Sequence, residues 1–398
     1  MKLAIISIAL PPSHTGQAVV LFQLLKNVKP DSYCLITQKN INYYQFGGNC
    51  TEKLPGKYYF LNPDNQIFQR FVKGLALLHL ERLFQNILAV RTYQIKKILI
   101  KEKCTSVIVC TGDLFDPPAA FLACKALEIP FIIYTFDYYS RQWTDPIFRS
   151  FAEKHEPQII KNASRVIVTN RCMQKEYNKR YGIDATIIHN PIDLEEYEKN
   201  AADSEQNNPN VSKIVYTGTI YEAHYSAFQN LITAIEKTKI PGLKLHLYTP
   251  QSVTYLEKNN ITGPVVIRDP LPNQQMPKIQ RNADILFLPL AFNSPYPDII
   301  KTSSPGKIGE YLASKRPILV HAPAESFLSW YFRKYSCGFV VDQENTDKLA
   351  TAIILLFSDK ELERALTENA YARAKEDFDL HSEQKKFYDI LNLQQQNV

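Results

Sequence analysis

The sequence lacks the patterns on which several classes of protein depend. No apolar run approaches the roughly 20 residues that a membrane-spanning helix needs, which excludes an integral membrane protein. The seven cysteines are odd in number and form no Cys-x-x-Cys pair, so neither a disulfide framework nor a zinc site is expected. Gly-x-Gly-x-x-Gly and His-Glu-x-x-His are also absent. A dehydrogenase-type dinucleotide site and a bound metal therefore find no support.

The composition that is present fits a soluble protein of two domains. The chain has 398 residues, roughly two to three times a typical domain. Hydrophobic residues make up 45% and charged residues 22%, which is ordinary for globular proteins. Most cysteines lie in apolar segments, as reduced thiols do, so we expect a cytoplasmic protein. The run Leu3–Leu10 fits a first buried strand better than a signal peptide, because Pro11-Pro12 follows it directly.

Positive charge is concentrated in the first half of the chain. The net charge is +6, with +7 from residues 1–200 and −1 from residues 201–398. Between Lys53 and Lys103 there are ten basic and three acidic residues. The apolar, helically spaced stretch 68–88 is interpreted first as domain core, and a peripheral contact of its flanking bases with anionic membrane stays open. Nucleic acid is not an expected partner, because no recognised binding module accompanies the charge.

Two series of apolar runs and helical patterns predict an α/β fold with two doubly wound, Rossmann-like domains. Continuous apolar runs, typical of strands buried on both faces, occur first at 3–10, 33–37, 106–110, 131–135 and 165–169. Helical patterns follow at 119–127 and 157–163. After a polar stretch the strands resume at 213–217, 243–248, 265–267, 285–289, 318–321 and 338–341, with a helix at 226–238 and a helical tail over 347–391.

Ligands of such sheets bind beyond the carboxyl ends of the strands, so the following loops are the candidate sites. In the segment 302–320, Ser303 and Ser304 are good N-cap residues and Pro305 suits a first helical turn. A helix from there to about residue 314 is predicted. Its free N–H groups and Lys307 would form an anion site, and Glu310 would accept hydrogen bonds from a ribose diol.

The run Ser304-Pro-Gly-Lys-Ile-Gly-Glu-Tyr-Leu-Ala313 resembles the donor-site helix of GT-B glycosyltransferases. The resemblance is to the retaining family four, of group 1 type, in polysaccharide biosynthesis. Four further pieces stand in the family's order, at 163–169, 187–193, 214–219 and 282–289. The resemblance therefore covers nearly the whole chain and implies the GT-B fold, with its C-terminal helix crossing back to the N-terminal domain.

The resemblance also implies roles for particular residues. Glu310 would hold the nucleotide ribose, and Lys307 with the Ser303 and Ser304 backbone would hold the diphosphate and stabilise the leaving group. The remaining residues expected at the nucleotide-sugar site are Gly16, His14, Gly218, Thr219, Leu271 and Thr302, of which Leu271 lies in the loop near which the base packs in relatives.

Asp137 follows the strand at 131–135 and is expected to orient the acceptor hydroxyl or to accept its proton. Capping of the next helix is an equally weighted alternative for it. This chain departs from the family pattern at three places. Phe136 stands where many relatives have a histidine, Thr302 stands where they have the first Glu of a Glu-x7-Glu pair, and 219–224 lacks the usual Arg and Lys.

The predicted domains are an acceptor-binding domain over 1–197, a linker over 198–211, a donor-binding domain over 212–370, and a C-terminal helix over 371–398 that packs on the first. The predicted reaction moves a hexosyl unit, most simply glucose, from a UDP-sugar to a glycan or lipid-linked acceptor with retention, and without a metal or other cofactor. Two alternatives stay open: a catalytically silent nucleotide-sugar-binding relative, and a UDP-sugar epimerase.

Overall fold

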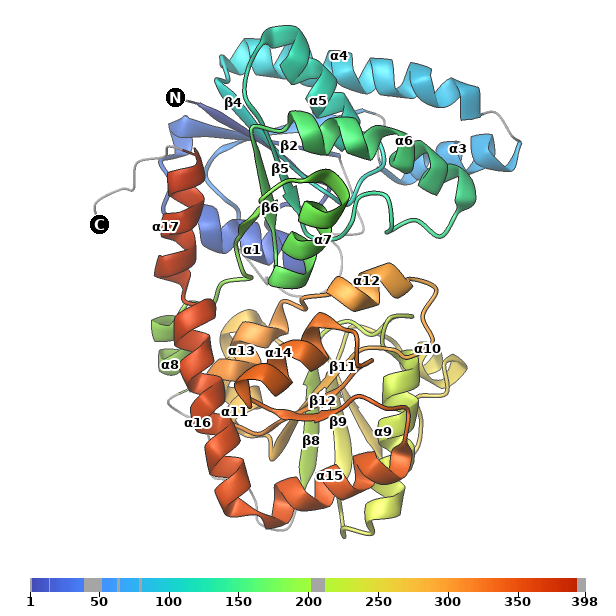
Figure 1. Cartoon of the computed structure of the whole chain (residues 1–398), viewed down its shortest axis with the longest axis vertical. Coiled ribbons are helices and arrows are strands. Elements are labelled where there is room, and N and C mark those ends of the chain that lie inside the picture. Colours follow the sequence, from blue (N-terminus) through green and yellow to red (C-terminus); the bar gives the residue numbers. More distant parts are fainter. Residues whose placement is uncertain are drawn as a thin grey trace. The chain divides into compact units, whose positions relative to one another are not determined.

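The computed structural model describes residues 2–13, 15–38, 52–62, 65–78, 81–201 and 212–391, and for residues 65–69 and 81 the backbone alone. The described chain divides into two compact units (Figure 1). The first combines the chain up to His189 with the segment from Glu383 onward, and the second runs from Asn190 to Ser382.

The first unit is built on a parallel sheet with the strand order β3-β2-β1-β4-β5-β6-β7. Its strands are β1 (Leu3–Ile6), β2 (Tyr33–Gln38), β3 (Lys57–Leu61), β4 (Ser106–Cys110), β5 (Phe131–Thr135), β6 (Arg165–Val168) and β7 (Thr186–Ile187). Its helices are α1 (Gly16–Leu25), α3 (Asn65–Leu77), α4 (Phe84–Glu102), α5 (Asp116–Leu127), α6 (Pro146–Asn162) and α7 (Arg171–Tyr181), with short 3₁₀ turns at Pro30–Ser32 and Glu81–Leu83.

The second unit has a parallel sheet with the order β10-β9-β8-β11-β12-β13. Its strands are β8 (Lys213–Thr217), β9 (Lys244–Tyr248), β10 (Val265–Arg268), β11 (Ile285–Pro289), β12 (Ile318–His321) and β13 (Phe339–Val341). Its helices are α8 (Leu194–Ala201), α9 (Tyr225–Thr238), α10 (Val253–Lys258), α11 (Met276–Arg281), α12 (Pro297–Thr302), α13 (Lys307–Ala313), α14 (Phe327–Tyr335), α15 (Thr346–Ser358) and α16 (Lys360–Asp377), with a 3₁₀ turn at Asn273–Gln275.

Both sheets repeat one connection pattern. In each, the third, second and first strands in chain order are followed across the sheet by the fourth, fifth and sixth. The direction of winding reverses between β1 and β4 in the first unit and between β8 and β11 in the second. Ligands of doubly wound sheets bind beyond the carboxyl ends of the strands at this reversal. The predicted fold class, two doubly wound domains, is confirmed.

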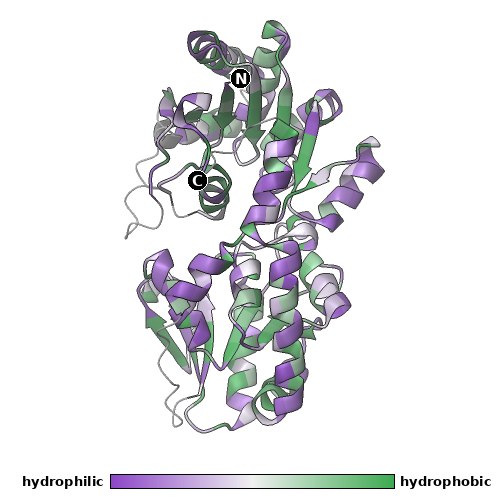
Figure 2. Cartoon of the chain, turned by 90° about the vertical axis from the view of Figure 1, so that its left-hand side faces the viewer, coloured by the Kyte–Doolittle hydropathy of each residue, from purple (hydrophilic) through white to green (hydrophobic). Residues whose placement is uncertain are grey.

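The apolar runs of the sequence become strands covered on both faces by helices. Every residue of β2, β4, β5 and β11 is buried, as a parallel sheet between two helical layers requires. Figure 2 shows the strands as largely hydrophobic and the helices as mixed along their length. The strand expected at 3–10 ends earlier, at Ile6. There the hydroxyl of Ser7 accepts from the amide of Ala9 and donates to its carbonyl, which turns the chain out of the ladder.

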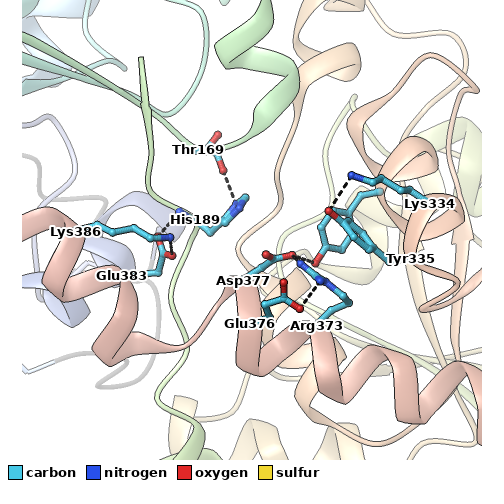
Figure 3. A network of polar contacts seen from close by, with 10 residues as sticks. Thr169, His189, Lys334, Tyr335, Arg373, Glu376, Asp377, Glu383 and Lys386 are labelled. Atoms are coloured by element: carbon cyan, nitrogen blue, oxygen red, sulfur yellow. Dashed lines mark hydrogen bonds and ion pairs between the residues drawn. The ribbon is translucent and has the colours of Figure 1, made fainter. Parts of the chain in front are cut away.

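The two connections between the units lie side by side within the second unit. The amide of Ile192 donates to the carbonyl of Phe378 at 2.8 Å, and the amide of Leu380 donates to the carbonyl of Ile192 at 3.0 Å. Near them, Asp377 accepts hydrogen bonds from Tyr331 and Arg373, so α16 is tied to α14 (Figure 3).

Helix α8 belongs with the second unit, although the sequence placed its residues in the first domain and the linker. The hydroxyl of Tyr197 donates to Gln280 at 2.7 Å, and Glu198 pairs with Arg281 at 2.6 Å. The division of the chain therefore falls at His189, earlier than the expected 197. Likewise α16 belongs to the second unit. The chain returns to the first unit at Glu383, beyond the end of α16, and not at the expected residue 371.

The last helix, α17 (Leu380–Leu391), packs on the first unit. Its Gln384 donates to the carbonyl of Gln23 at 2.6 Å and its Tyr388 donates to the carbonyl of Leu24 at 3.0 Å. Glu383 accepts from the amide of His189 at 2.8 Å, while the ring of His189 donates to the carbonyl of Thr169 (Figure 3). The crossing helix expected from the sequence is confirmed. Among the described residues, no helix is long and apolar enough to cross a membrane.

Replacing Phe387 by alanine tests how firmly α17 is held. Phe387 is fully buried in the core of the first unit. We expect the first unit to lose about 3–5 kcal/mol of unfolding free energy, because a large cavity is left behind. Lys385 is exposed on the same helix, and Lys385→Ala should change the free energy by less than about 0.5 kcal/mol. Urea unfolding followed by Trp143 fluorescence, in a Trp330→Phe background, would measure both. Equal losses of unfolding free energy in the two variants would contradict the packing of α17 on the first unit.

Candidate functional site

The second unit gathers polar side chains where its sheet reverses direction. The loop after β8 begins at Gly218, and α13 stands between β11 and β12. Lys307 is the first residue of α13, and Glu310 lies one turn further along. Residues three apart share one face of a helix, so both side chains project toward the carboxyl end of β8.

Lys307 is held against an aromatic ring without a carboxylate partner. Its Nζ donates to the hydroxyl of Tyr216 at 3.2 Å and lies 4.7 Å from the centre of that ring. Within the part of the chain that the structure describes, no carboxylate lies in ion-pairing distance of it. Burial lowers the pKa of the Lys307 ammonium, against the opposite effect of Tyr311 and Glu310. A cation in this setting favours an anionic ligand.

Gly218 is a position that requires glycine. Its φ is +122°, and a Cβ there would meet the Lys307 Nζ at 3.0 Å. The next carbonyl, that of Thr219, accepts from the hydroxyl of Tyr216 at 2.8 Å. The loop after β8 therefore presents bare backbone beside the lysine. The structure thus brings Gly218, Thr219 and Lys307 together, as the sequence suggested.

Glu310 is oriented by residues that the sequence did not point to. The amide of Gln280 donates to its carboxylate at 2.6 Å and lies 3.4 Å from the hydroxyl of Thr217. The carbonyl of Gln280 accepts from Tyr197 at 2.7 Å. Gln280 is fully buried. Burial raises the pKa of the Glu310 carboxyl, while the bond from Gln280 and the charge of Lys307 lower it.

The predicted start of the donor-site helix was wrong by two or three residues. Helix α13 begins at Lys307 with Gly306 in the N-cap position and no side-chain cap. Ser303 and Ser304 lie instead in the connection from α12, whose last residue is Thr302. The carbonyl of Ser304 accepts from Asn190 at 2.8 Å. A serine in an extended connection offers its hydroxyl to a ligand rather than to a helix end, and the buried Ser304 Oγ has no hydrogen-bond partner among the described residues.

Two more residues of the second unit lie in loops that follow its strands. Leu271 is half-buried in the loop that follows β10, the edge strand of the sheet. His224 precedes α9 and is 5% exposed, and its ring stands 4.5 Å from that of Tyr221 and 6.1 Å from that of Tyr216. Burial and the charge of Lys307 lower the pKa of His224 to about 3, so its imidazole is neutral. The sequence noted His224 only as part of a stretch without Arg or Lys.

In the first unit, Asp137 lies just beyond the carboxyl end of β5. The amides of Phe136 and Asp137 approach the hydroxyl of Thr111, which follows β4, at 3.0 and 3.4 Å. Burial raises the pKa of the Asp137 carboxyl to about 6. Capping of the next helix is ruled out as its role, because Asp145 caps α6 through the amides of Ile147 and Phe148.

The other residues of the first unit that the sequence predicted are Gly16 and His14. Gly16 is the first residue of α1, and a Cβ there would meet nothing within 4 Å. His14 lies outside the described residues. Phe136, in the position of the family's histidine, stacks on Tyr134 with ring centres 4.3 Å apart. Among the described residues, no group of three or more His, Cys, Asp or Glu side chains is placed to hold a metal ion.

Two family models match the chain in succession. Glycosyltransferase Family 4 matches residues 61–196, and Glycosyl transferases group 1 matches residues 211–359. A comparison with curated proteins gave no match.

Solved structures share the architecture along the whole chain. Sucrose-phosphate synthase from Thermosynechococcus elongatus is 14% identical, with 98% of each chain covered and a TM-score of 0.67. HepE from Anabaena, in complex with UDP and glucose, is 13% identical over 98% of this chain and 99% of its own, with a TM-score of 0.67. An alpha,alpha-trehalose-phosphate synthase (UDP-forming) from Burkholderia xenovorans, in complex with glucose-6-phosphate, is 11% identical over 98% and 100%, with a TM-score of 0.68. At these identities the likeness concerns the fold, whereas the two family models name the class of protein. The chain belongs to the GT-B glycosyltransferases of group 1.

Proposed function

We propose that this glycosyltransferase moves a hexosyl unit, first of all glucose, from a UDP-sugar to a glycan or lipid-linked acceptor with retention, in polysaccharide biosynthesis. The observation that carries the proposal is the placement of Lys307 and Glu310 on one turn of α13, beside the bare backbone at Gly218. A cation and a carboxylate so placed suit a diphosphate next to a ribose. HepE, which has the same fold, was crystallised with UDP-glucose.

In the proposed complex Glu310 accepts hydrogen bonds from the ribose hydroxyls. Its carboxylate is already held by Gln280, which is itself held by Tyr197. Such a chain of bonds fixes the rotamer before the ligand arrives, so less entropy is lost on binding. Leu271, in the loop after the edge strand β10, is proposed to contact the base, as the resemblance to the family implies.

Lys307 would contact the diphosphate and stabilise the negative charge that develops on the leaving group. The hydroxyls of Ser303 and Ser304, the segment ending at Thr302 and the backbone of Gly218 and Thr219 would supply the remaining donors. Gly16 and His14 of the first unit are proposed to contact the transferred sugar. With this set the reaction requires no bound metal or other cofactor.

Asp137 is proposed to orient the acceptor hydroxyl or to accept its proton. It stands beyond a strand end of the first unit, with its carboxyl pKa near 6, and a group with this pKa is largely ionised at neutral pH and able to take a proton.

Replacing Glu310 by alanine should abolish most of the affinity for UDP. Loss of a hydrogen-bonded carboxylate costs about 1.5–3 kcal/mol, which is roughly ten- to hundredfold in Kd. Calorimetric titration with UDP, GDP and ADP in chelator-treated buffer would measure this. Glu257→Ala, at an exposed position of the same unit, is the matched control. Should no nucleotide bind the wild-type protein, the donor-site assignment fails. Binding without turnover of any UDP-sugar would favour the catalytically silent alternative.

Replacing Gln280 by methionine should weaken UDP binding roughly five- to tenfold, because the isosteric side chain no longer holds Glu310. The double variant Gln280→Met/Glu310→Ala should bind no more weakly than Glu310→Ala alone, since both changes remove the same interaction. Titration of the four proteins of the cycle with UDP would show this. Additive losses would mean that Gln280 contributes to UDP binding independently of Glu310.

The rate should depend on the protonation of Asp137. Because its pKa is raised from the ordinary value to about 6, the carboxylate is present above that pH and is lost as the pH falls through it. We expect kcat/KM to fall about tenfold per unit below pH 6. Asp137→Asn should lower kcat at neutral pH and remove this limb, while leaving the Kd for UDP unchanged. If kcat/KM of the variant still falls below pH 6, the titrating group is a residue other than Asp137.

A further inference from the structure

Exposed apolar side chains gather on α3 and the first half of α4 in the first unit. Of the thirteen large hydrophobic residues found exposed in the described chain, seven lie between Phe71 and Ile100. Leu77 is 81% exposed and Leu78 is 69% exposed, values reached only when a side chain stands free of its own domain. We name six of the seven the α3–α4 face: Phe71, Leu77, Leu78, Leu83, Val90 and Tyr93.

The face is continuous between the two helices. A hollow of about 320 Å³ is lined by Phe71 of α3 and by Leu83, Ile87 and Val90 at the start of α4. Asn62, Asn86 and Arg91 also line this hollow, but most of its surface is apolar. Exposed apolar surface of this kind marks a contact with another molecule or a membrane.

The charges around the face have one sign. Arg70 and Lys73 of α3, Arg82 of the 3₁₀ turn before α4, and Lys97 of α4 are exposed. Between Asn65 and Lys101 the sequence has a single acidic residue, Glu81. Arg91 does not take part, because it is buried beside Asp116 at 3.5 Å. The face therefore combines protruding apolar groups with a nearly unopposed positive charge.

We propose that the α3–α4 face docks on the surface of an anionic phospholipid bilayer. In this arrangement the leucines enter the boundary between headgroups and acyl chains, and the bases remain among the lipid phosphates. A second copy of the chain is a poorer occupant, because two identical faces would bring like charges together. The proposal is independent of the proposed donor site, which lies in the other unit.

Flotation of the full chain with lipid vesicles tests the proposed docking of the α3–α4 face. Vesicles of phosphatidylcholine alone are compared with an equimolar mixture with phosphatidylglycerol. We expect partitioning onto the anionic vesicles to exceed that onto the neutral ones by at least about tenfold. It should weaken as salt is raised, because the screening length shrinks from about 10 Å at 0.1 M to about 3 Å at 1 M.

Two double variants separate the apolar from the electrostatic contribution to membrane binding. Leu77→Asp/Leu78→Asp should lower partitioning at least about tenfold. Arg82→Gln/Lys97→Gln should lower it by about thirtyfold at low salt and by much less at high salt. The matched controls lie in the second unit: Ile354→Asp/Leu355→Asp for exposed apolar groups and Lys244→Gln/Lys258→Gln for exposed bases. Both should leave partitioning unchanged.

Three results would overturn the proposal. The first is an absence of wild-type protein from the floated anionic vesicles. The second is an equal loss in the controls and the α3–α4 variants. The third is a wild-type dimer, by light scattering without vesicles, that Leu77→Asp/Leu78→Asp converts to a monomer, which would assign the face to a second copy. Unchanged melting curves of the variants would confirm that any loss is one of binding.

Discussion

The contact of Gly309 with the two connections governs the candidate site. A Cβ at Gly309 would lie 3.3 Å from Ile192 and 3.4 Å from Phe378, so α13 packs closely against both segments at this glycine. Gly309 stands between Lys307 and Glu310 on the same short helix. The direction of both functional side chains is therefore set by the place where the chain enters and leaves the second unit.

Burial acts on the two charged groups in opposite directions, and both effects favour the neutral forms. It lowers the pKa of Lys307 and raises that of Glu310, while their mutual attraction partly restores the charges. The Tyr216 ring and the Gln280 amide supply the remaining stabilisation. An anion beside Lys307 and donors beside Glu310 would replace the water that each group has lost. In the proposed site the fold thus meets part of the electrostatic cost of burying these groups before a ligand arrives.

Most of the strands could be predicted from the sequence, and so could the proximity of Gly218 and Lys307, whereas the residue that holds Glu310 could not. Fully buried parallel strands need continuous apolar runs, so the strands at 106–110, 131–135, 213–217 and 285–289 were predicted with the bounds that the structure gives. The edge strand β3 has only one fully buried residue and gave no such signal. Gln280 lies thirty residues from Glu310, and nothing in local spacing brings a glutamine to a distant carboxylate. The start of α13 was predicted wrongly because a serine can cap a helix only where the preceding connection brings its hydroxyl to the first backbone amides. Here Gly306 occupies the N-cap position instead.

The pairing of Ile192 with the segment after Phe378 also bears on how the first unit folds. Helix α17 completes the core of that unit, yet about 190 residues separate it from the rest. Closing so long a flexible loop carries a large entropy cost, which grows with the logarithm of its length. Once the second unit has folded, the segments at Ile192 and Phe378 through which the chain enters and leaves it lie side by side. The loop that must close to dock α17 is then effectively only a few residues long. By this estimate, prior folding of the second unit lowers the cost of docking α17 by about 3 kcal/mol, so the order of folding is built into the topology.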